Sequence, residues 1–279
     1  IWCVSTPRVG RWCSGKPDVL RAVVLAAVLS VLAACLHAPG ALRAQRVLLV
    51  GNSLSYRNDL PAHLSAIAGN AIASPVEVEM ISGGGQRIDQ HAARGVVQRE
   101  LASGRYTALV LQEWGRGLRC DAEFERFGFD CAASHAAHRA LVDAAQQHGV
   151  RVLLLGTYSP DADDARELHS AEQALAKKLG IEHVGFGDWP ALRARAPARV
   201  WLDSDGAHPG PDLSLLMALR VAKQLYEDIE PVAPFVVVYR DYRGDFTPKP
   251  DALASAQALD APLRERFVVE ADLRIMGMH

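Results

Sequence analysis

The stretch RVLLVGNSLS (residues 46–55) gives the clearest indication of the fold. Its apolar run, residues 46–50, is too short for a helix and ends at Gly51, a turn signal, so it is typical of a buried strand. Apolar residues at helical spacing follow over residues 60–71. A strand followed by a helix is the first half of a βαβ unit, and the rest of the chain continues this order.

Strands and helices alternate along the body of the chain. We expect further strands at 76–81, 107–111, 150–155 and 183–186, and helices at 96–101, 133–147, 165–179 and 213–226. This alternation is typical of parallel strands covered by helices. The sequence therefore predicts a three-layer α/β/α sandwich with a parallel central sheet, flavodoxin-like, over residues 45–228. In the extension at 229–279, residues 235–239 are strand-like and the remaining fold cannot be read.

Composition excludes several classes of protein. The chain has 279 residues, 49% hydrophobic and 22% charged, which is enough apolar material for a core and argues against intrinsic disorder. A formal net charge of -2 offers no overall field for polyanions. We therefore expect no nucleic-acid partner.

The first 44 residues have the pattern of an export signal. Basic residues precede an apolar run at 22–34, which is too short to span a bilayer because a membrane helix needs about 20 residues. The run closes on LAAC (residues 32–35), which resembles the bacterial lipobox and implies acylation of Cys35. The alternative is an ordinary signal peptide cut after Ala44. We expect a protein in the bacterial periplasm, or secreted, that contacts a membrane through a lipid anchor alone.

The predicted export bears on the redox state of the cysteines. Cys3, Cys13 and Cys35 fall in the leader, which leaves Cys120 and Cys131 in the body. In an oxidising compartment this pair predicts a local disulfide. Two buried free thiols are the alternative.

Polar residues cluster where the predicted strands end. Ser53 follows the first strand, residues 83–85 (GGG) the second and Gln112 the third, while Asp205 and His208 precede the last helix. Ligands of open parallel sheets bind at this edge, and the set supplies a nucleophile, an oxyanion donor, an orienting carboxylate and a base. Taken singly, Ser53 is equally well a helix cap, Gln112 a strand-end polar residue and His208 a surface residue. The glycines lack the spacing of a nucleotide-binding loop.

The end blocks resemble a known family. VLLVGNSLS (residues 47–55) looks like the first block of the GDSL or SGNH hydrolases, and DGAHP (residues 205–209) looks like their DxxH block. The similarity covers about residues 45–228. It implies ester hydrolysis with Ser53 as nucleophile, His208 as base and Asp205 as the partner of His208.

Two blocks depart from the family pattern. Asn52 stands where GDSL has Asp, and the GxND block, whose Asn donates to the oxyanion, appears as LQEW (residues 111–114). Gln112 offers the same amide on a longer stem. We expect the oxyanion to be bound by the N–H groups of Ser53 and Gly84, with Gly85 as the next choice, and by Gln112.

The resemblance implies a small-molecule or glycan ester as substrate, cleaved through an acyl-enzyme without cofactor or metal. Short acyl or acetyl esters, some on carbohydrate, are expected, with Asn52, Tyr56 and Trp114 contacting the substrate. A non-catalytic glycan-binding envelope protein and an acyltransferase with the same triad are the alternatives. His135 and His138 have a ligand-like spacing, but a solvated helix face is the preferred interpretation.

Overall fold

The computed structural model describes residues 45–72, 74–226, 235–238 and 256–259. The leader with Cys35 and most of the extension after residue 228 lie outside the described residues, so the expectations for export and lipidation are not addressed there. Among the described residues, no helix has both the length and the apolar character needed to cross a bilayer.

A five-stranded parallel sheet forms the centre of the fold. Its strands are β1 (Gln45–Asn52), β2 (Val76–Gly83), β3 (Ala108–Leu111), β4 (Arg151–Leu155) and β5 (Glu182–Val184), in the order β2-β1-β3-β4-β5. The order reverses direction at β1, where β2 lies on one side and β3 on the other. In parallel sheets this switch point opens a crevice at the carboxyl ends of the strands.

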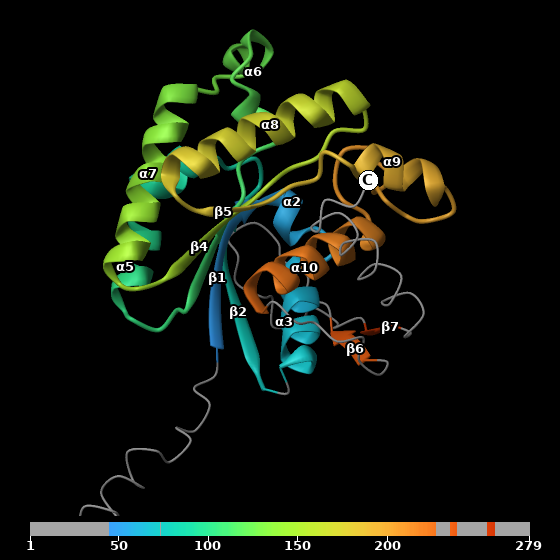
Figure 1. Ribbon diagram of the computed structural model, residues 1–279, viewed down its shortest axis with the longest axis horizontal. Coiled ribbons are helices and arrows are strands. Elements are labelled where there is room, and N and C mark those ends of the chain that lie inside the picture. Colours follow the sequence, from blue (N-terminus) through green and yellow to red (C-terminus); the bar gives the residue numbers. More distant parts are fainter. Residues whose placement is uncertain (1–44, 73, 227–234, 239–255, 260–279) are drawn as a thin grey trace, which may run out of the picture. The chain divides into compact units, whose positions relative to one another are not determined.

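Helices cover both faces of the sheet, which confirms the predicted three-layer α/β/α fold (Figure 1). One face carries α3 (Leu60–Ala71), α9 (Trp189–Arg195) and α10 (Pro211–Tyr226), whose apolar side chains join a core with alternate residues of β1 such as Leu49. The opposite core contains Leu48 and side chains of α4 (Ile88–Arg94), α5 (Val96–Ala102), α7 (Cys131–Gln147) and α8 (Ala162–Leu179).

Burial explains why the central part of β1 is apolar. Its residues 47–50 are at most 1% exposed because neighbouring strands flank both edges and helices cover both faces. Full burial of one such side chain stabilises the folded state by about 1.5–3 kcal/mol. β1 is thus a rigid base for the residues that follow it.

Short elements complete the described chain. They are α2 (Ser53–Tyr56), the 3-10 helix η1 (Gly117–Arg119) and α6 (Ala122–Arg126). Beyond the sandwich, β6 (Phe235–Val238) and β7 (Ala256–Leu259) pair antiparallel, and β6 confirms the strand expected there.

Candidate active site

Ser53, His208 and Asp205 form a continuous hydrogen-bonded chain. His208 Nε2 lies 2.9 Å from Ser53 Oγ, and His208 Nδ1 lies 2.6 Å from Asp205 Oδ2. The Nδ1–H donates to the carboxylate, which leaves Nε2 as the acceptor that faces the serine hydroxyl. The structure therefore brings together the nucleophile, base and orienting acid predicted from the sequence.

The Asp205 carboxylate is held in its ionised form. Its Oδ1 accepts hydrogen bonds from the backbone N–H groups of His208 and Ala207, each at 2.9 Å. These bonds, followed by the bond from the His208 ring, lower the pKa of Asp205 well below its usual range. Arg57 adds a partly exposed ion pair at 3.3 Å. A permanent carboxylate orients the imidazole and stabilises the imidazolium that forms when Ser53 loses its proton.

A closed loop, rather than a helix, holds His208. The backbone of Asp203 donates to the carbonyl of His208 at 2.9 Å, and Leu202 pairs with Pro209 in an antiparallel bridge. From outside the loop, the buried hydroxyl of Tyr158 donates to the Ala207 carbonyl at 2.8 Å. These contacts fix the imidazole without a helix.

Ser53 begins helix α2 directly after β1. The first N–H groups of a helix have no partner inside the helix. At α2 the side chain of Asn52 accepts from the N–H of Leu54 at 3.0 Å. The end of β1 is closely packed at Gly51: His91 Nε2 donates to the Gly51 carbonyl at 2.7 Å, and Ser55 Oγ lies 2.3 Å from where a Cβ at residue 51 would stand. Residue 51 must therefore be glycine for Ser55 to pack there.

Asn52 holds three loops together and does not reach the substrate cavity. It is fully buried, its Oδ1 caps α2 by accepting from the Leu54 N–H, and its Nδ2 donates to the carbonyls of Gln86 and Glu113 at 3.2 and 3.1 Å. The opposite amide orientation would place an oxygen against two carbonyls, so the donors set the orientation. The expected substrate contact of Asn52 is corrected to a link between the ends of β1, β2 and β3.

Gln112 also lies away from the cavity. Its side chain is fully buried, its Oε1 accepts from Ser55 Oγ at 2.6 Å and its Nε2 faces the Gly156 carbonyl at 3.4 Å. The amide lies inside the protein, between Ser55, shortly after β1, and Gly156, after β4, and outside the set of residues that line the cavity. The expectation that Gln112 donates to the oxyanion is therefore corrected: its amide is engaged in structural hydrogen bonds.

Glu113 supports the site but was not predicted from the sequence. The side chain is 1% exposed, and its Oε1 accepts from the backbone N–H groups of Ile88 at 3.1 Å and Trp114 at 2.7 Å. Its Oε2 accepts from Ser134 Oγ at 2.6 Å. A buried carboxylate with three donors ties the start of α4 to the loop after β3. An acidic residue at the end of an apolar strand was the available signal.

The glycine turn after β2 exposes backbone donors. Gly84 and Gly85 are exposed, and Gly85 has φ +64°, a conformation that favours glycine. A Cβ at residue 84 would lie 3.3 Å from the hydroxyl of Tyr56, which places this turn beside α2. Neither glycine nor Tyr56 is among the residues that line the cavity described next, so their expected roles stay predictions.

A cavity of about 590 Å³ opens at the triad. Ser53 and His208 lie in its wall together with four aromatic side chains: Trp114, Phe124, Phe127 and Tyr158. Phe127 is 65% exposed, which is unusual for a large apolar side chain and places an apolar edge at the surface. Trp114 was predicted to contact substrate, and its place in the wall is consistent with that prediction.

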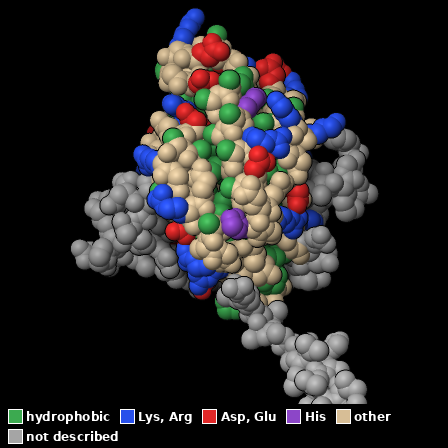
Figure 2. Space-filling view, turned by 90° about the vertical axis from the view of Figure 1, so that its left-hand side faces the viewer, with side chains coloured by type: hydrophobic (Ala, Val, Ile, Leu, Met, Phe, Trp, Pro, Cys, Tyr) green, Lys and Arg blue, Asp and Glu red, His purple; other side chains and the backbone are tan. Residues whose placement is uncertain are grey.

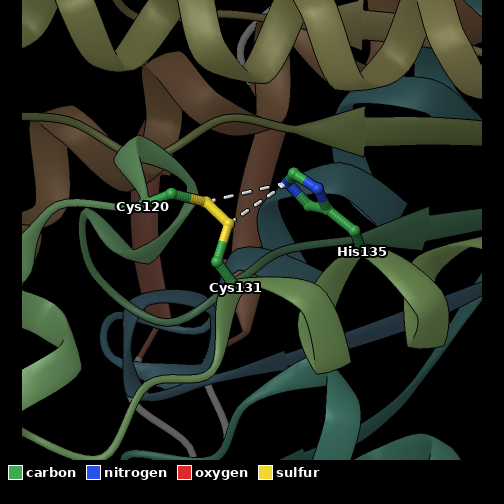
Figure 3. Close-up of side chains that lie close together, drawn as sticks. All are labelled: Cys120, Cys131 and His135. Atoms are coloured by element: carbon green, nitrogen blue, oxygen red, sulfur yellow. Dashed lines mark hydrogen bonds between the residues drawn. A yellow bond between two sulfur atoms is a disulfide. The ribbon is translucent and has the colours of Figure 1, made fainter.

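A disulfide joins Cys120 and Cys131, as predicted (Figure 3). It closes the loop that carries Phe124 and Phe127 and so braces one wall of the cavity. His135 points its Nε2 at both sulfurs, 3.8 Å from each. If the two cysteines were reduced, their thiolates and the His135 ring could bind a soft metal ion. With the sulfurs joined, the cluster has no thiolates to bind a metal.

His138 does not lie on a solvated helix face. Its ring is fully buried, and its Nδ1 donates to the Ser134 carbonyl at 2.9 Å. The carboxylate of Glu113 lies 3.9 Å from the same nitrogen. The expectation of a solvated face is wrong for His138 because this face of α7 packs against the loop after β3.

Charged side chains of both signs occur on the face drawn in Figure 2. Figure 2 shows Lys and Arg side chains interspersed with Asp and Glu on the face it draws. This distribution agrees with the near-neutral net charge of the chain.

Comparisons with known proteins support the fold. TesA has a TM-score of 0.50 and 21% identity, covering 66% of this chain and 99% of TesA. A variant of Axe2, an acetyl-xylooligosaccharide esterase from Geobacillus stearothermophilus, has a TM-score of 0.50 and 11% identity, covering 66% of this chain and 94% of Axe2. At these identities the likeness shows a shared fold. No protein family model matches the chain.

One curated protein matches by sequence. Elongation factor Ts of Chlorobium chlorochromatii (strain CaD3) is 26% identical over 204 residues, which is 66% of this chain and 63% of that protein. The chain spans less than two thirds of that relative's length. An identity of this size over part of both chains does not establish a common family.

Proposed function

We propose that the protein is a serine ester hydrolase of the GDSL or SGNH type. The observation that carries this proposal is the chain from Ser53 through His208 to Asp205, with links of 2.9 and 2.6 Å, in the wall of a cavity. A serine that is hydrogen-bonded to an imidazole, which is in turn oriented by a carboxylate, is the arrangement that activates a hydroxyl as a nucleophile. The family resemblance of residues 47–55 and 205–209 supports the same reaction.

The mechanism follows from the three side chains. His208 Nε2 takes the proton of Ser53 as Oγ attacks the ester carbonyl, and the carbonyl oxygen becomes an oxyanion. The imidazolium then protonates the leaving alcohol as the ester bond breaks, which leaves an acyl group on Ser53. A water molecule, deprotonated by His208, attacks this acyl group, and collapse of the second oxyanion releases the acid and restores Ser53.

We assign the oxyanion to backbone donors at two loops. Ser53 N–H lies at the start of α2, and Gly84 lies in the exposed turn after β2, with Gly85 as the alternative. Because β1 and β2 are neighbouring strands, both loops reach the same edge of the sheet. Gln112 is left out of this set because its amide is bound to Ser55 and Gly156.

We propose short acyl or acetyl esters, including esters on carbohydrate, as substrates. The aromatic wall of Trp114, Phe124, Phe127 and Tyr158 offers faces on which a sugar ring or a small apolar group packs. The shared fold with an acetyl-xylooligosaccharide esterase makes acetylated oligosaccharides the first natural substrates to assay.

We also propose that the protein is exported and anchored through a lipid on Cys35. The basic residues, the apolar run at 22–34 and the LAAC ending support this proposal. The disulfide in the body is compatible with an oxidising compartment. Labelled palmitate should mark the protein made in a bacterial host and should not mark Cys35→Ala; unlabelled protein would favour cleavage near Ala44.

Hydrolysis of p-nitrophenyl acetate by the purified protein tests the proposed function. Ser53→Ala should remove nearly all activity, whereas Ser204→Ala, an exposed serine in the loop before His208, should retain it. Equal rates for wild type and Ser53→Ala would contradict the proposal. A folded wild type without hydrolysis that binds glycans would identify a binding protein, and acyl transfer to an added sugar in preference to water would identify a transferase.

A further inference from the structure

A donor is missing from the oxyanion site once Gln112 is excluded. Gln112 lies at one of the positions corresponding to the GxND block, but its amide is directed into the protein. Trp114 follows two residues later on the same loop and lies in the cavity wall with Ser53. Its indole carries one N–H donor and no acceptor.

The indole nitrogen of Trp114 lies near the glycine turn. Trp114 Nε1 lies 3.9 Å from where a Cβ at Gly85 would stand. Trp114 follows β3 and Gly85 follows β2, while β1 lies between these two strands and ends at Ser53. The indole thus extends from the loop after β3 toward the turn after β2, and Trp114 shares the cavity wall with Ser53 at the end of β1.

The indole N–H is available, and the residue is held in place. Within the described part of the chain, Trp114 Nε1 donates to no protein acceptor. The backbone N–H of Trp114 donates to the buried Glu113 carboxylate at 2.7 Å, and the ring packs edge to face on Phe124 with centroids 5.4 Å apart. A donor that is fixed before the reaction does not have to reorganise when charge develops.

We propose that the indole N–H of Trp114 donates a hydrogen bond to the oxyanion, beside the backbone donors of Ser53 and the glycine turn. This inference rests on the proposed esterase function and adds a catalytic residue to it. The indole replaces the side-chain amide that the GxND pattern places in this loop. Glu113 is then a positioning residue, because it anchors the backbone that carries the indole.

Trp114→Phe tests the inference because it keeps an aromatic ring on Phe124 and removes the N–H. With p-nitrophenyl acetate, kcat should fall by about 10²- to 10³-fold while KM changes by less than about 3-fold, since the lost bond forms in the transition state. The rate is counted per active site titrated with a fluorophosphonate, so misfolded protein does not enter it. Trp201→Phe is the matched control, because the indole of Trp201 donates to the Ala196 carbonyl instead; it should keep kcat.

Butylboronic acid gives a second readout. It forms a tetrahedral adduct with the serine, in which a boronate oxygen stands for the oxyanion, so its inhibition constant should rise at least 10-fold in Trp114→Phe. A fall in kcat of less than 10-fold, or a change confined to KM, would overturn the inference and leave Trp114 as a substrate-stacking residue. In that case Ser53→Ala would still be inactive, and the proposed esterase function would stand.

Discussion

Replacing Asn52 with Asp restores the residue of the GDSL pattern, yet the structure predicts that it destabilises the protein. The Nδ2 group of Asn52 donates to the carbonyls of Gln86 and Glu113 in a fully buried setting. An ionised aspartate has no donor, so it would place an oxygen against both carbonyls. Each buried polar group left without a partner costs about 1–3 kcal/mol, which gives a loss of about 2–6 kcal/mol for Asn52→Asp at neutral pH.

The loss should depend on pH in a defined direction. Burial beside two carbonyl oxygens disfavours the carboxylate and raises the pKa of the new Asp in the folded state above its unfolded value of about 3.9. The folded variant then binds more protons than the unfolded chain between these two pKa values, so its stability falls as pH rises through this window. The deficit relative to wild type should be smaller at pH 4.5 than at pH 7.

Urea unfolding followed by circular dichroism measures this deficit. Asn70→Asp is the matched control: the same chemical change at a half-buried position on α3, expected to cost less than about 1 kcal/mol. Surface substitutions usually change the free energy of unfolding by less than about 0.5 kcal/mol. A free energy of unfolding for Asn52→Asp within about 0.5 kcal/mol of wild type at pH 7 would therefore refute the assigned role of Asn52.

Three further predictions concern other parts of the fold. Gln112→Ala should lower the free energy of unfolding, measured in urea, by about 2–4 kcal/mol, because two buried hydrogen bonds are lost. The kcat per titrated site should stay within about 3-fold of wild type. A far larger fall in kcat would show that Gln112 does contribute to the oxyanion site. Breaking the disulfide by Cys120→Ser with Cys131→Ser should cost about 3 kcal/mol in the chain-entropy model, and an unchanged melting temperature would contradict this. Burial lowers the pKa of His63 from 6.5 to about 4, so the unfolded chain binds more protons between these values and stability is lost as pH falls. Wild type should lose about 2 kcal/mol more than His63→Gln between pH 7.5 and pH 5, and equal losses would show that His63 is not the group responsible.

Local patterns were sufficient to predict the sheet and the long helices. The strand of β1 and helix α3 occur where the apolar spacing placed them, because buried strands and amphipathic helices are decided by short-range periodicity. The short helices α4, α6 and α9 were not predicted. Each has seven residues or fewer, so its helical period is hardly repeated, and tertiary packing decides whether it forms. Of the helices of this length, α5 was predicted, because its apolar residues recur at helical spacing.

The candidate site could be predicted where the order of the chain determines it. Ser53 and His208 follow from their places at a strand end and before a helix, and their contact follows from the topology. The direction of a side chain at a strand end could not be predicted. Asn52, Gln112 and Glu113 all lie at this edge, and the sequence does not say which of them faces the cavity. The structure directs all three inward, where their hydrogen bonds hold the loops together.

Covalent trapping of the nucleophile tests whether Ser53 is activated by His208. The protein is treated with a fluorophosphonate, digested and mapped by mass spectrometry, beside His208→Ala treated in the same way. We expect one phosphonyl adduct, on Ser53, in the wild type. In His208→Ala the adduct should form at least about 10²-fold more slowly, because a general base of this kind contributes about 10²- to 10⁴-fold to the rate. An adduct on another serine, or labelling of Ser53 at the same rate in both proteins, would contradict it.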